Sequence, residues 1–210
     1  MRILFQGDSI TDGGRDYRNY HNMGTSYPLY AAEMIRDAFP EIEFEFINQG
    51  IGGNRTDQLF DRLYTDAITL EPDIVSVLIG VNDVWARYSR SRSIQTSVEQ
   101  IEANFRAIMK SLRERTHAKI LVLTPYLLDS EVNEPWRAEL DEIQPILRRL
   151  ADEYADAYVP LHELFPQALK DQPHPQFYSP DGVHPNPNGA KFIAEHYFNA
   201  IAPLIRSCVK

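Results

Sequence analysis

Cysteine is scarce in this chain of 210 residues, which contains a single one, Cys208. One thiol forms no disulfide within the chain and provides no Cys/His ligand cluster for a metal. Apolar runs are also short: none is long enough to span a bilayer, and the N-terminal run is too short for a signal peptide. These absences predict a cytoplasmic protein that has no membrane partner and needs no metal or other cofactor.

Basic residues are outnumbered by acidic ones. The chain has 21 lysines and arginines against 30 aspartates and glutamates, so its formal net charge is -9 at pH 7. An acidic surface repels the phosphates of nucleic acids and of anionic lipids, which argues against a nucleic-acid partner. Low-complexity tracts, internal repeats and linkers are absent, and 43% of the residues are hydrophobic. We therefore predict one domain over residues 1–210.

Apolar runs of strand length alternate along the chain with segments of helical periodicity. Such alternation is typical of a parallel sheet with helices on both faces. The run over 74–79 is nearly continuous, as expected for a central strand, whereas Phe44 and Phe46 alternate with glutamates, which favours an outer strand. We predict an α/β fold, a three-layer αβα sandwich of flavodoxin-like type with a five-stranded parallel sheet. The predicted strands are 2–6, 43–48, 74–79, 120–123 and 157–161.

Some of the predicted helices have recognisable starts. Ser97 and Gln100 have the spacing of a capping box, in which each side chain accepts a hydrogen bond from a free backbone N–H. The last helix is predicted over 190–205. Pro145 lies within a helix predicted over 134–154, where it should kink the helix or begin a new first turn.

The first strand ends at the residues GDSIT, in which Ser9 allows two interpretations. Ser9 and Asp12 have the spacing of a capping box, and capping serines far outnumber catalytic ones. A serine at the carboxyl end of a strand can alternatively attack a bound substrate. The choice depends on what else the fold brings to the same place.

Three loops are expected at one edge of the sheet. In an open parallel sheet, the loops that follow the strands meet at the carboxyl edge, where ligands bind. Ser9, residues 48–54 (NQGIGGN) and residues 80–83 (GVND) all follow predicted strands. A hydroxyl, free N–H groups and an asparagine amide are the parts that hold and attack a carbonyl group. A candidate base lies in the loop YSPDGVHPNPNG, where Asp181 and His184 are three residues apart.

The four motifs GDSIT, NQGIGGN, GVND and DGVH resemble, in this order, the four sequence blocks of the SGNH (GDSL-type) esterases and lipases. The resemblance spans nearly the whole chain, and it overturns the preference for a capping role of Ser9. It implies that Ser9 is the nucleophile and His184 the general base, with Asp181 as the acid that orients the base. Ile10 stands where the family has the leucine of GDSL, a change of apolar shape that should not affect the chemistry.

The resemblance also implies an oxyanion hole. Its donors would be the backbone N–H groups of Ser9 and Gly53 and the side-chain amide of Asn82. Gly53 is chosen over Gly52 because it lies five residues after Asn48, as in the family's second block. The choice between the two glycines stays open at this point.

The substrate is indicated less directly. The segments GDSITDGGR, GTSYP and IGVNDVW are most similar to the carbohydrate acetylesterases of the family, particularly the acetylxylan esterases. This similarity implies a small-molecule ester or an acetylated oligosaccharide as substrate, deacylated through an acyl-enzyme. The polar loop after Ser9, rich in tyrosine and asparagine, fits a small acyl group on a sugar-like alcohol. The candidate substrate contacts are Asp8, Trp85 and Tyr178, and further aromatic candidates are Tyr88, Trp136 and Phe177.

Other functions fit parts of the sequence. A lysophospholipase or thioesterase would use the same chemistry, and acyl-chain preference would separate it from an acetylesterase. A flavodoxin-like nucleotide or flavin binder fits the sheet pattern, although complete GxGxxG and GxxxxGK motifs are missing. No sequence feature marks an interface, so a homo-oligomer is left open. A metal-dependent phosphoesterase would draw its ligands from Asp8, Asp12, Asn82, Asp83 and His184.

Overall fold

The computed structural model describes residues 1–88, 96–128, 134–172 and 174–209. Its centre is a parallel sheet of five strands in the order β2-β1-β3-β4-β5. The order and the helices on both faces confirm the predicted α/β sandwich. The strands are β1 (Arg2–Gly7), β2 (Glu45–Gly50), β3 (Ile74–Leu78), β4 (Lys119–Leu123) and β5 (Ala157–Val159).

The predicted bounds of β2 are wrong, although its place at the edge of the sheet is confirmed. The strand was expected over 43–48, but it starts at Glu45 and continues to Gly50. The polar residues Asn48 and Gln49 give no strand signal by themselves, yet they pair with β1 up to the partners Gly7 and Gly50. The pairing brings the loops after β1 and β2 side by side.

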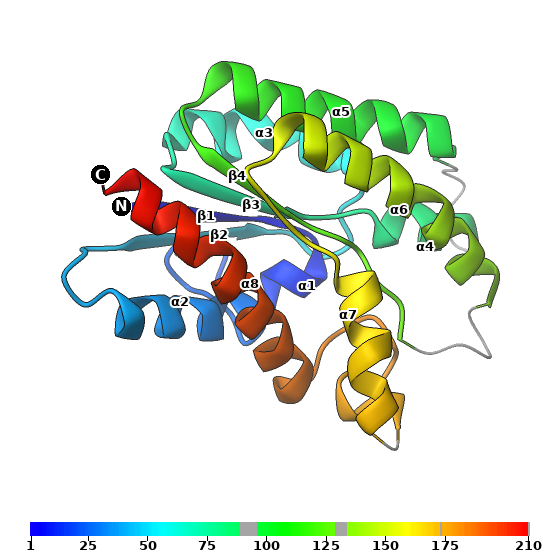
Figure 1. Ribbon diagram of the computed structural model, residues 1–210. Coiled ribbons are helices and arrows are strands. Elements are labelled where there is room, and N and C mark those ends of the chain that lie inside the picture. The colour runs from blue at the N-terminus through cyan, green and yellow to red at the C-terminus, as the bar shows by residue number, and fades with distance from the viewer. Residues whose placement is uncertain (89–95, 129–133, 173, 210) are drawn as a thin grey trace.

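Helices cover both faces of the sheet (Figure 1). The short helices α1 (Ser9–Asp12) and α4 (Val81–Tyr88) begin just after β1 and β3. Single 3-10 turns lie at η1 (Ile68–Leu70), η2 (Leu169–Asp171) and η3 (Pro175–Phe177). One face carries α3 (Thr56–Asp66), α5 (Val98–Arg115) and α6 (Glu134–Tyr154), and the other carries α2 (Tyr27–Ala38), α7 (Leu161–Ala168) and α8 (Pro187–Cys208).

Side chains of β1 alternate between the two layers. Ile3 and Phe5 belong to the apolar core shared with α2 and α8, whereas Leu4 belongs to the core shared with α3, α5 and α6. All three are completely buried. Burial of a side chain of this size contributes roughly 1.5–3 kcal/mol. Because a shift by one residue would exchange the two faces, both cores fix the register of the strand that leads to Ser9.

The capping box predicted at Ser97 is corrected, and one of the two alternatives for Pro145 is excluded. Ser97 caps α5 by accepting a hydrogen bond from the Gln100 N–H at 3.2 Å, but the Gln100 side chain donates to Asn104 instead of completing a capping box. The long helix α6 continues through Pro145, so this proline does not begin a new helix.

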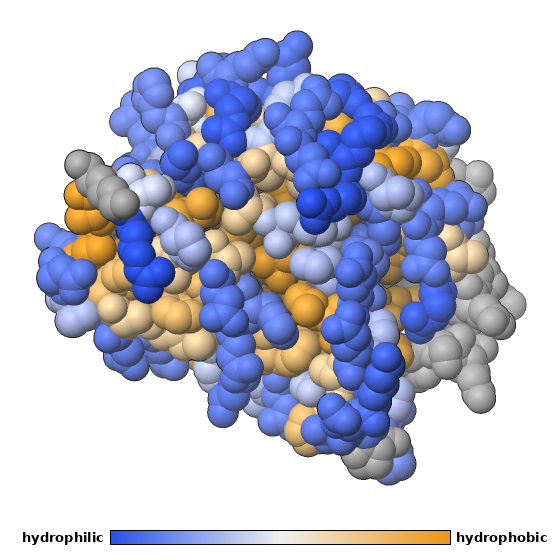
Figure 2. Space-filling model, in the orientation of Figure 1, coloured by the Kyte–Doolittle hydropathy of each residue, from blue (hydrophilic) through white to orange (hydrophobic). Residues whose placement is uncertain are grey.

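Hydrophilic side chains dominate the face of the molecule seen in Figure 2, and hydrophobic ones show mainly between the helices. Within the described ranges, no helix combines the length and the apolar character needed to cross a membrane.

Candidate active site

The nucleophile candidate lies where β1 turns into α1. Asp8, not Ser9, caps this helix: its Oδ1 accepts a hydrogen bond from the Ile10 N–H at 3.0 Å. The capping interpretation of Ser9 is therefore wrong. The helix ends after one turn at Gly13, whose φ of 57° favours glycine. The Ser9 hydroxyl remains available for other contacts.

Ser9, His184 and Asp181 form a continuous chain of hydrogen bonds. The Ser9 Oγ lies 2.9 Å from His184 Nε2, and His184 Nδ1 lies 2.6 Å from Asp181 Oδ2. In this arrangement the imidazole can take the proton of the serine through one nitrogen while the carboxylate holds the other. The three residues come from opposite ends of the chain, 175 positions apart for Ser9 and His184.

The loop that carries the histidine is held by its own backbone. Asp181 Oδ1 accepts hydrogen bonds from the N–H groups of Val183 at 2.9 Å and His184 at 2.7 Å. Partial burial raises the pKa of Asp181, but the hydrogen bonds from His184 and Val183 outweigh it and keep this pKa below its ordinary value. The loop is joined to α8, which Asn186 caps by accepting from two backbone N–H groups. Asp181 is thus an ionised partner in a fixed position.

The geometry favours Gly53 over Gly52 as an oxyanion donor. The Gly52 N–H donates to Asp12 Oδ2 at 2.9 Å, so it is already engaged. Gly53 lines the cavity beside Ser9 and has a φ of 78°, which other residues rarely adopt. Asn82 lines the same cavity and donates one N–H to the Asn54 carbonyl at 3.0 Å. Because a carboxamide has two N–H groups, the other can face a substrate.

A second glycine permits the close approach of the two loops. A Cβ on Gly50 would lie 2.3 Å from the backbone nitrogen of Asp12. The end of β2 therefore packs directly against α1, the helix that begins with Ser9. Any larger residue at this position would separate the glycine-rich loop from Ser9.

A cavity of about 450 Å³ opens over these groups, a size that suits a small molecule. Its walls include Val81, Val183 and the two tryptophans Trp85 and Trp136, whose rings meet edge to face with centroids 6.2 Å apart. Trp85 thus lies where a substrate contact was predicted, and Trp136 lies beside it. The polar part of the lining consists of Ser9, Gly53, Asn82, Asp181 and His184.

Two of the predicted substrate contacts, Asp8 and Tyr178, are buried and are not among the residues that line this cavity. Asp8 is 1% exposed and faces the interior below the nucleophile. Tyr178 is 8% exposed and packs among Phe165, Phe177 and Phe192. Both residues are adjacent in sequence to loop segments at the site, but their side chains point into the core. The side chain of Tyr88 lies outside the described part of the structure.

Asp8 makes the stability of the protein depend on pH. Burial, opposed by the Ile10 N–H and by His184, raises the pKa of this carboxyl to about 7. The folded protein then holds the proton more tightly than the unfolded chain, so the free energy of unfolding falls as pH rises from about 4 to about 7 and is level above. We expect the Tm of Asp8→Asn minus the Tm of the wild type to be about 5 °C larger at pH 8 than at pH 5.

Calorimetry at both pH values checks this expectation, with Asp61→Asn on the exposed side of α3 as a matched control. A difference in Tm between Asp8→Asn and the wild type that is the same at both pH values would contradict it.

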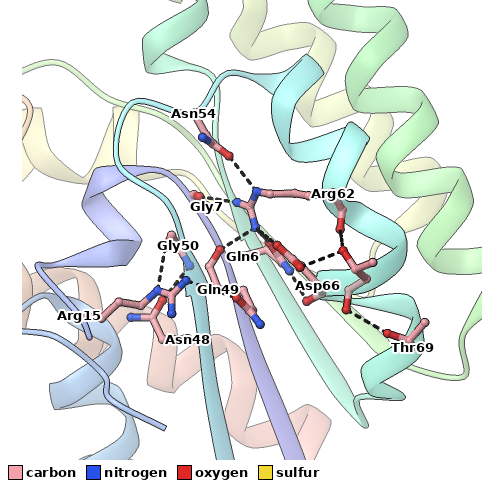
Figure 3. A network of polar contacts seen from close by, with 11 residues as sticks. Gln6, Gly7, Arg15, Asn48, Gln49, Gly50, Asn54, Arg62, Asp66 and Thr69 are labelled. Atoms are coloured by element: carbon pink, nitrogen blue, oxygen red, sulfur yellow. Dashed lines mark hydrogen bonds and ion pairs between the residues drawn. The ribbon is translucent and has the colours of Figure 1, made fainter. Parts of the chain in front are cut away.

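The contacts of several supporting residues have no recognisable sequence signal. Asp83 is completely buried and accepts from the Thr56 hydroxyl at 2.6 Å and the Thr56 N–H at 3.0 Å, which ties α4 to the start of α3. Arg62 donates to the ends of β1 and β2 (Figure 3). Thr56 and Asp83, for example, are 27 positions apart in the sequence, and only the folded topology brings them together.

The residues considered for a metal-dependent phosphoesterase are engaged separately. Asp12 accepts from Gly52 and Arg15, Asp83 from Thr56, and His184 pairs with Asp181. Among the described residues, no cluster of three or more His, Cys, Asp or Glu side chains could hold one metal ion. The site therefore consists of a hydroxyl, an imidazole, a carboxylate and amide donors.

Known proteins resemble this chain in both sequence and fold. The sequence matches the GDSL-like Lipase/Acylhydrolase family over residues 5–192. An acetylxylan esterase of Geobacillus stearothermophilus is 29% identical over 206 residues, covering 95% of this chain and 93% of that protein.

Solved structures lead to the same group of enzymes. Axe2, an acetylxylan esterase from Geobacillus stearothermophilus, superposes with a TM-score of 0.87 at 28% identity, over 94% of this chain and 92% of that one. Catalytic mutants of Axe2 replace a serine, a histidine or an aspartate by alanine. An alpha/beta hydrolase enzyme from the metagenome of Lake Arreo, LAE5, gives 0.88 at 28% identity, over 97% and 95%. The protein is accordingly a carboxylic ester hydrolase, and its chain belongs to the GDSL-like lipase/acylhydrolase family.

Proposed function

We propose that this protein is a serine esterase that removes acetyl groups from carbohydrates, with residues 1–210 acting as one SGNH domain. The observation that carries the proposal is the chain from Ser9 Oγ to His184 Nε2 and from His184 Nδ1 to Asp181, with distances of 2.9 and 2.6 Å. His184 takes the Ser9 proton while the oxygen attacks the ester carbonyl. The alcohol leaves with that proton, and an acetyl-enzyme remains. Water, deprotonated by the same imidazole, then releases acetate.

The tetrahedral intermediate needs donors that are in place before the reaction. The N–H groups of Ser9 and Gly53 and the free N–H of the Asn82 amide supply them in this proposal. Since these groups are oriented by the fold, they need little reorganisation when negative charge develops on the carbonyl oxygen.

The form of the cavity supports a small acyl group and a sugar alcohol. Trp85 and Trp136 offer aromatic faces and edges within a volume of about 450 Å³, and such rings bind the apolar faces of sugars. The relatives named as acetylxylan esterases point in the same direction. Acetylated xylo-oligosaccharides are therefore the substrates we propose.

Removal of the Asn82 amide is expected to lower kcat by about 10²- to 10³-fold while KM changes little, because the amide binds the charged oxygen more strongly than the carbonyl of the substrate. Steady-state kinetics of Asn82→Ala with p-nitrophenyl acetate measures this effect. Asn199→Ala, on the exposed side of α8, is the control. An unchanged kcat would restrict Asn82 to its structural bond with Asn54.

The substrate assignment is tested by hydrolysis of p-nitrophenyl acetate and octanoate, followed by acetate release from acetylated xylo-oligosaccharide. We expect preference for acetate and deacetylation of the sugar, both lost in Ser9→Ala. Preference for octanoate without sugar deacetylation would overturn the carbohydrate assignment in favour of lysophospholipase or thioesterase activity. Turnover that does not depend on Ser9 would overturn the mechanism as well.

A further inference from the structure

We propose that Arg62 is a positioning residue for the oxyanion hole, an inference that rests on the proposed function of Ser9, Gly53 and Asn82. Arg62 lies on α3, more than one turn after the start of that helix, and its side chain is 14% exposed. In the described part of the chain, none of the hydrogen-bond partners of Arg62 lines the cavity or belongs to the candidate triad. Its role would therefore be exerted through other residues.

The guanidinium group of Arg62 joins the two strands that end at the site (Figure 3). One terminal nitrogen donates to the Gly7 carbonyl at 3.0 Å, and the other donates to the Gln49 carbonyl at 2.8 Å. Gly7 is two residues before the nucleophile, and Gln49 is four residues before Gly53. The ends of β1 and β2 are thereby held at a fixed separation by one planar group.

The third nitrogen of the guanidinium, Nε, is linked through Asn54 to a proposed oxyanion donor, the Asn82 amide. Arg62 Nε donates to Asn54 Oδ1 at 2.8 Å, and the Asn54 carbonyl accepts the Asn82 amide at 3.0 Å. Asn54 also follows Gly53 immediately. Asn54 is therefore joined by its carbonyl to the Asn82 amide and by its peptide bond to Gly53, so a displacement of Asn54 is transmitted to both.

The geometry of these contacts requires arginine and not merely a positive charge. Asp66, one turn further along α3, accepts from the same side chain at 3.1 Å, so a lysine at position 62 could keep the ion pair. A lysine ammonium cannot reach the carbonyls of two strands and the Asn54 side chain at once, because it lacks the planar fork. Arg62→Lys thus separates the charge from the positioning function.

We expect Arg62→Lys to lower kcat for p-nitrophenyl acetate by about 10- to 100-fold with KM changed less than about threefold, because small displacements of catalytic donors are costly. The control is Arg148→Lys, which alters an exposed ion pair of the same four-residue spacing on α6. A wild-type kcat in Arg62→Lys, or an equal loss in the control, would overturn the proposal.

A double-mutant cycle identifies the route of the effect. If Arg62 acts through Asn54 on the Asn82 amide, the loss caused by Arg62→Lys shrinks at least about fivefold when Asn82 is already alanine. Full multiplication of the two losses would show that Arg62 does not act on the Asn82 amide, and would overturn this route of positioning. Should Arg62→Lys fail to fold, Asn54→Ala replaces it in the cycle, because it removes the Arg62 Nε acceptor and keeps the Asn54 carbonyl.

The choice of p-nitrophenyl acetate allows failure of the positioning role of Arg62 to be distinguished from failure of the proposed function. Hydrolysis of p-nitrophenyl acetate does not depend on sugar recognition. If wild-type turnover is lost in Ser9→Ala but Arg62→Lys behaves as wild type, only the positioning role is wrong. If turnover persists in Ser9→Ala, the proposed function itself fails.

Discussion

Replacement of Ser9 by alanine is expected to lower kcat by at least about 10⁴-fold, because Ser9 carries the one side-chain hydroxyl that lines the cavity next to His184 among the described residues. The variant should fold normally, since the Ser9 hydroxyl contacts the exposed imidazole and not the core. Initial rates with p-nitrophenyl acetate and Tm by calorimetry measure the two effects separately. Weak residual turnover above the uncatalysed rate is compatible with the account, because the oxyanion donors remain.

Ser207→Ala provides the matched control. Its hydroxyl lies on α8 and donates only locally, to the Leu204 carbonyl at 2.7 Å. We expect wild-type kinetics from this variant. Retention of most activity in Ser9→Ala would remove Ser9 from the mechanism.

His184→Ala is expected to lower kcat by about 10⁴- to 10⁶-fold, because both halves of the reaction use the imidazole to move a proton. Asp181→Asn should lose about 10- to 100-fold less, since asparagine can still orient the ring but does not stabilise the charged imidazolium. The 2.6 Å bond between His184 Nδ1 and Asp181 Oδ2 is the contact that this comparison tests. Single-turnover acetylation and deacetylation rates measure the loss in each half-reaction.

His117→Ala, at an exposed turn far along the chain, is the control for the histidine variant. Equal and complete losses in Asp181→Asn and His184→Ala, with folding preserved, would contradict the expectation that orienting the ring is the main role of Asp181. A loss confined to deacetylation would contradict the role of His184 as base for Ser9.

The sequence predicts the sheet from local patterns, whereas the candidate site residues are predicted from their places after strands together with the resemblance of four motifs to the SGNH esterases. Continuous apolar residues mark β3, and polar residues at strand ends mark the carboxyl edge of the sheet. Topology then brings Ser9, Gly53 and His184 together, as their places after strands and before α8 suggest. The relative positions of these loops are a property of the parallel fold and need few specific contacts.

Two local interpretations, the cap of α1 and the position of Tyr178, differ from the structure because each residue can make more than one favourable contact. Ser9 and Asp8 are both good capping residues, and the sequence does not tell which one turns toward the Ile10 N–H. Tyr178 lies in a polar loop, but its ring finds neighbouring aromatic residues of α7 and α8. For Asp8 the competing contact is itself local, whereas for Tyr178 a tertiary contact outweighs the local pattern.

Arg62 illustrates what the sequence does not reveal. An arginine four residues before an aspartate on a helix is typical of an exposed ion pair. Its bonds to Gly7, Gln49 and Asn54 follow from strand pairing between β1 and β2, which extends two residues beyond the predicted end of β2. Without those two residues in the sheet, Arg62 has no strand end to hold.

The most direct measurement is intact-protein and peptide mass spectrometry of the enzyme quenched in acid during turnover of an acetyl ester. The proposed acetyl-enzyme mechanism predicts a species heavier by one acetyl group, with the modification on the peptide that contains Ser9. This species should be absent in Ser9→Ala and should accumulate when deacetylation is slowed. Acetylation of another residue, or rapid Ser9-dependent turnover without any acetyl-enzyme when deacetylation limits the rate, would contradict the proposed mechanism.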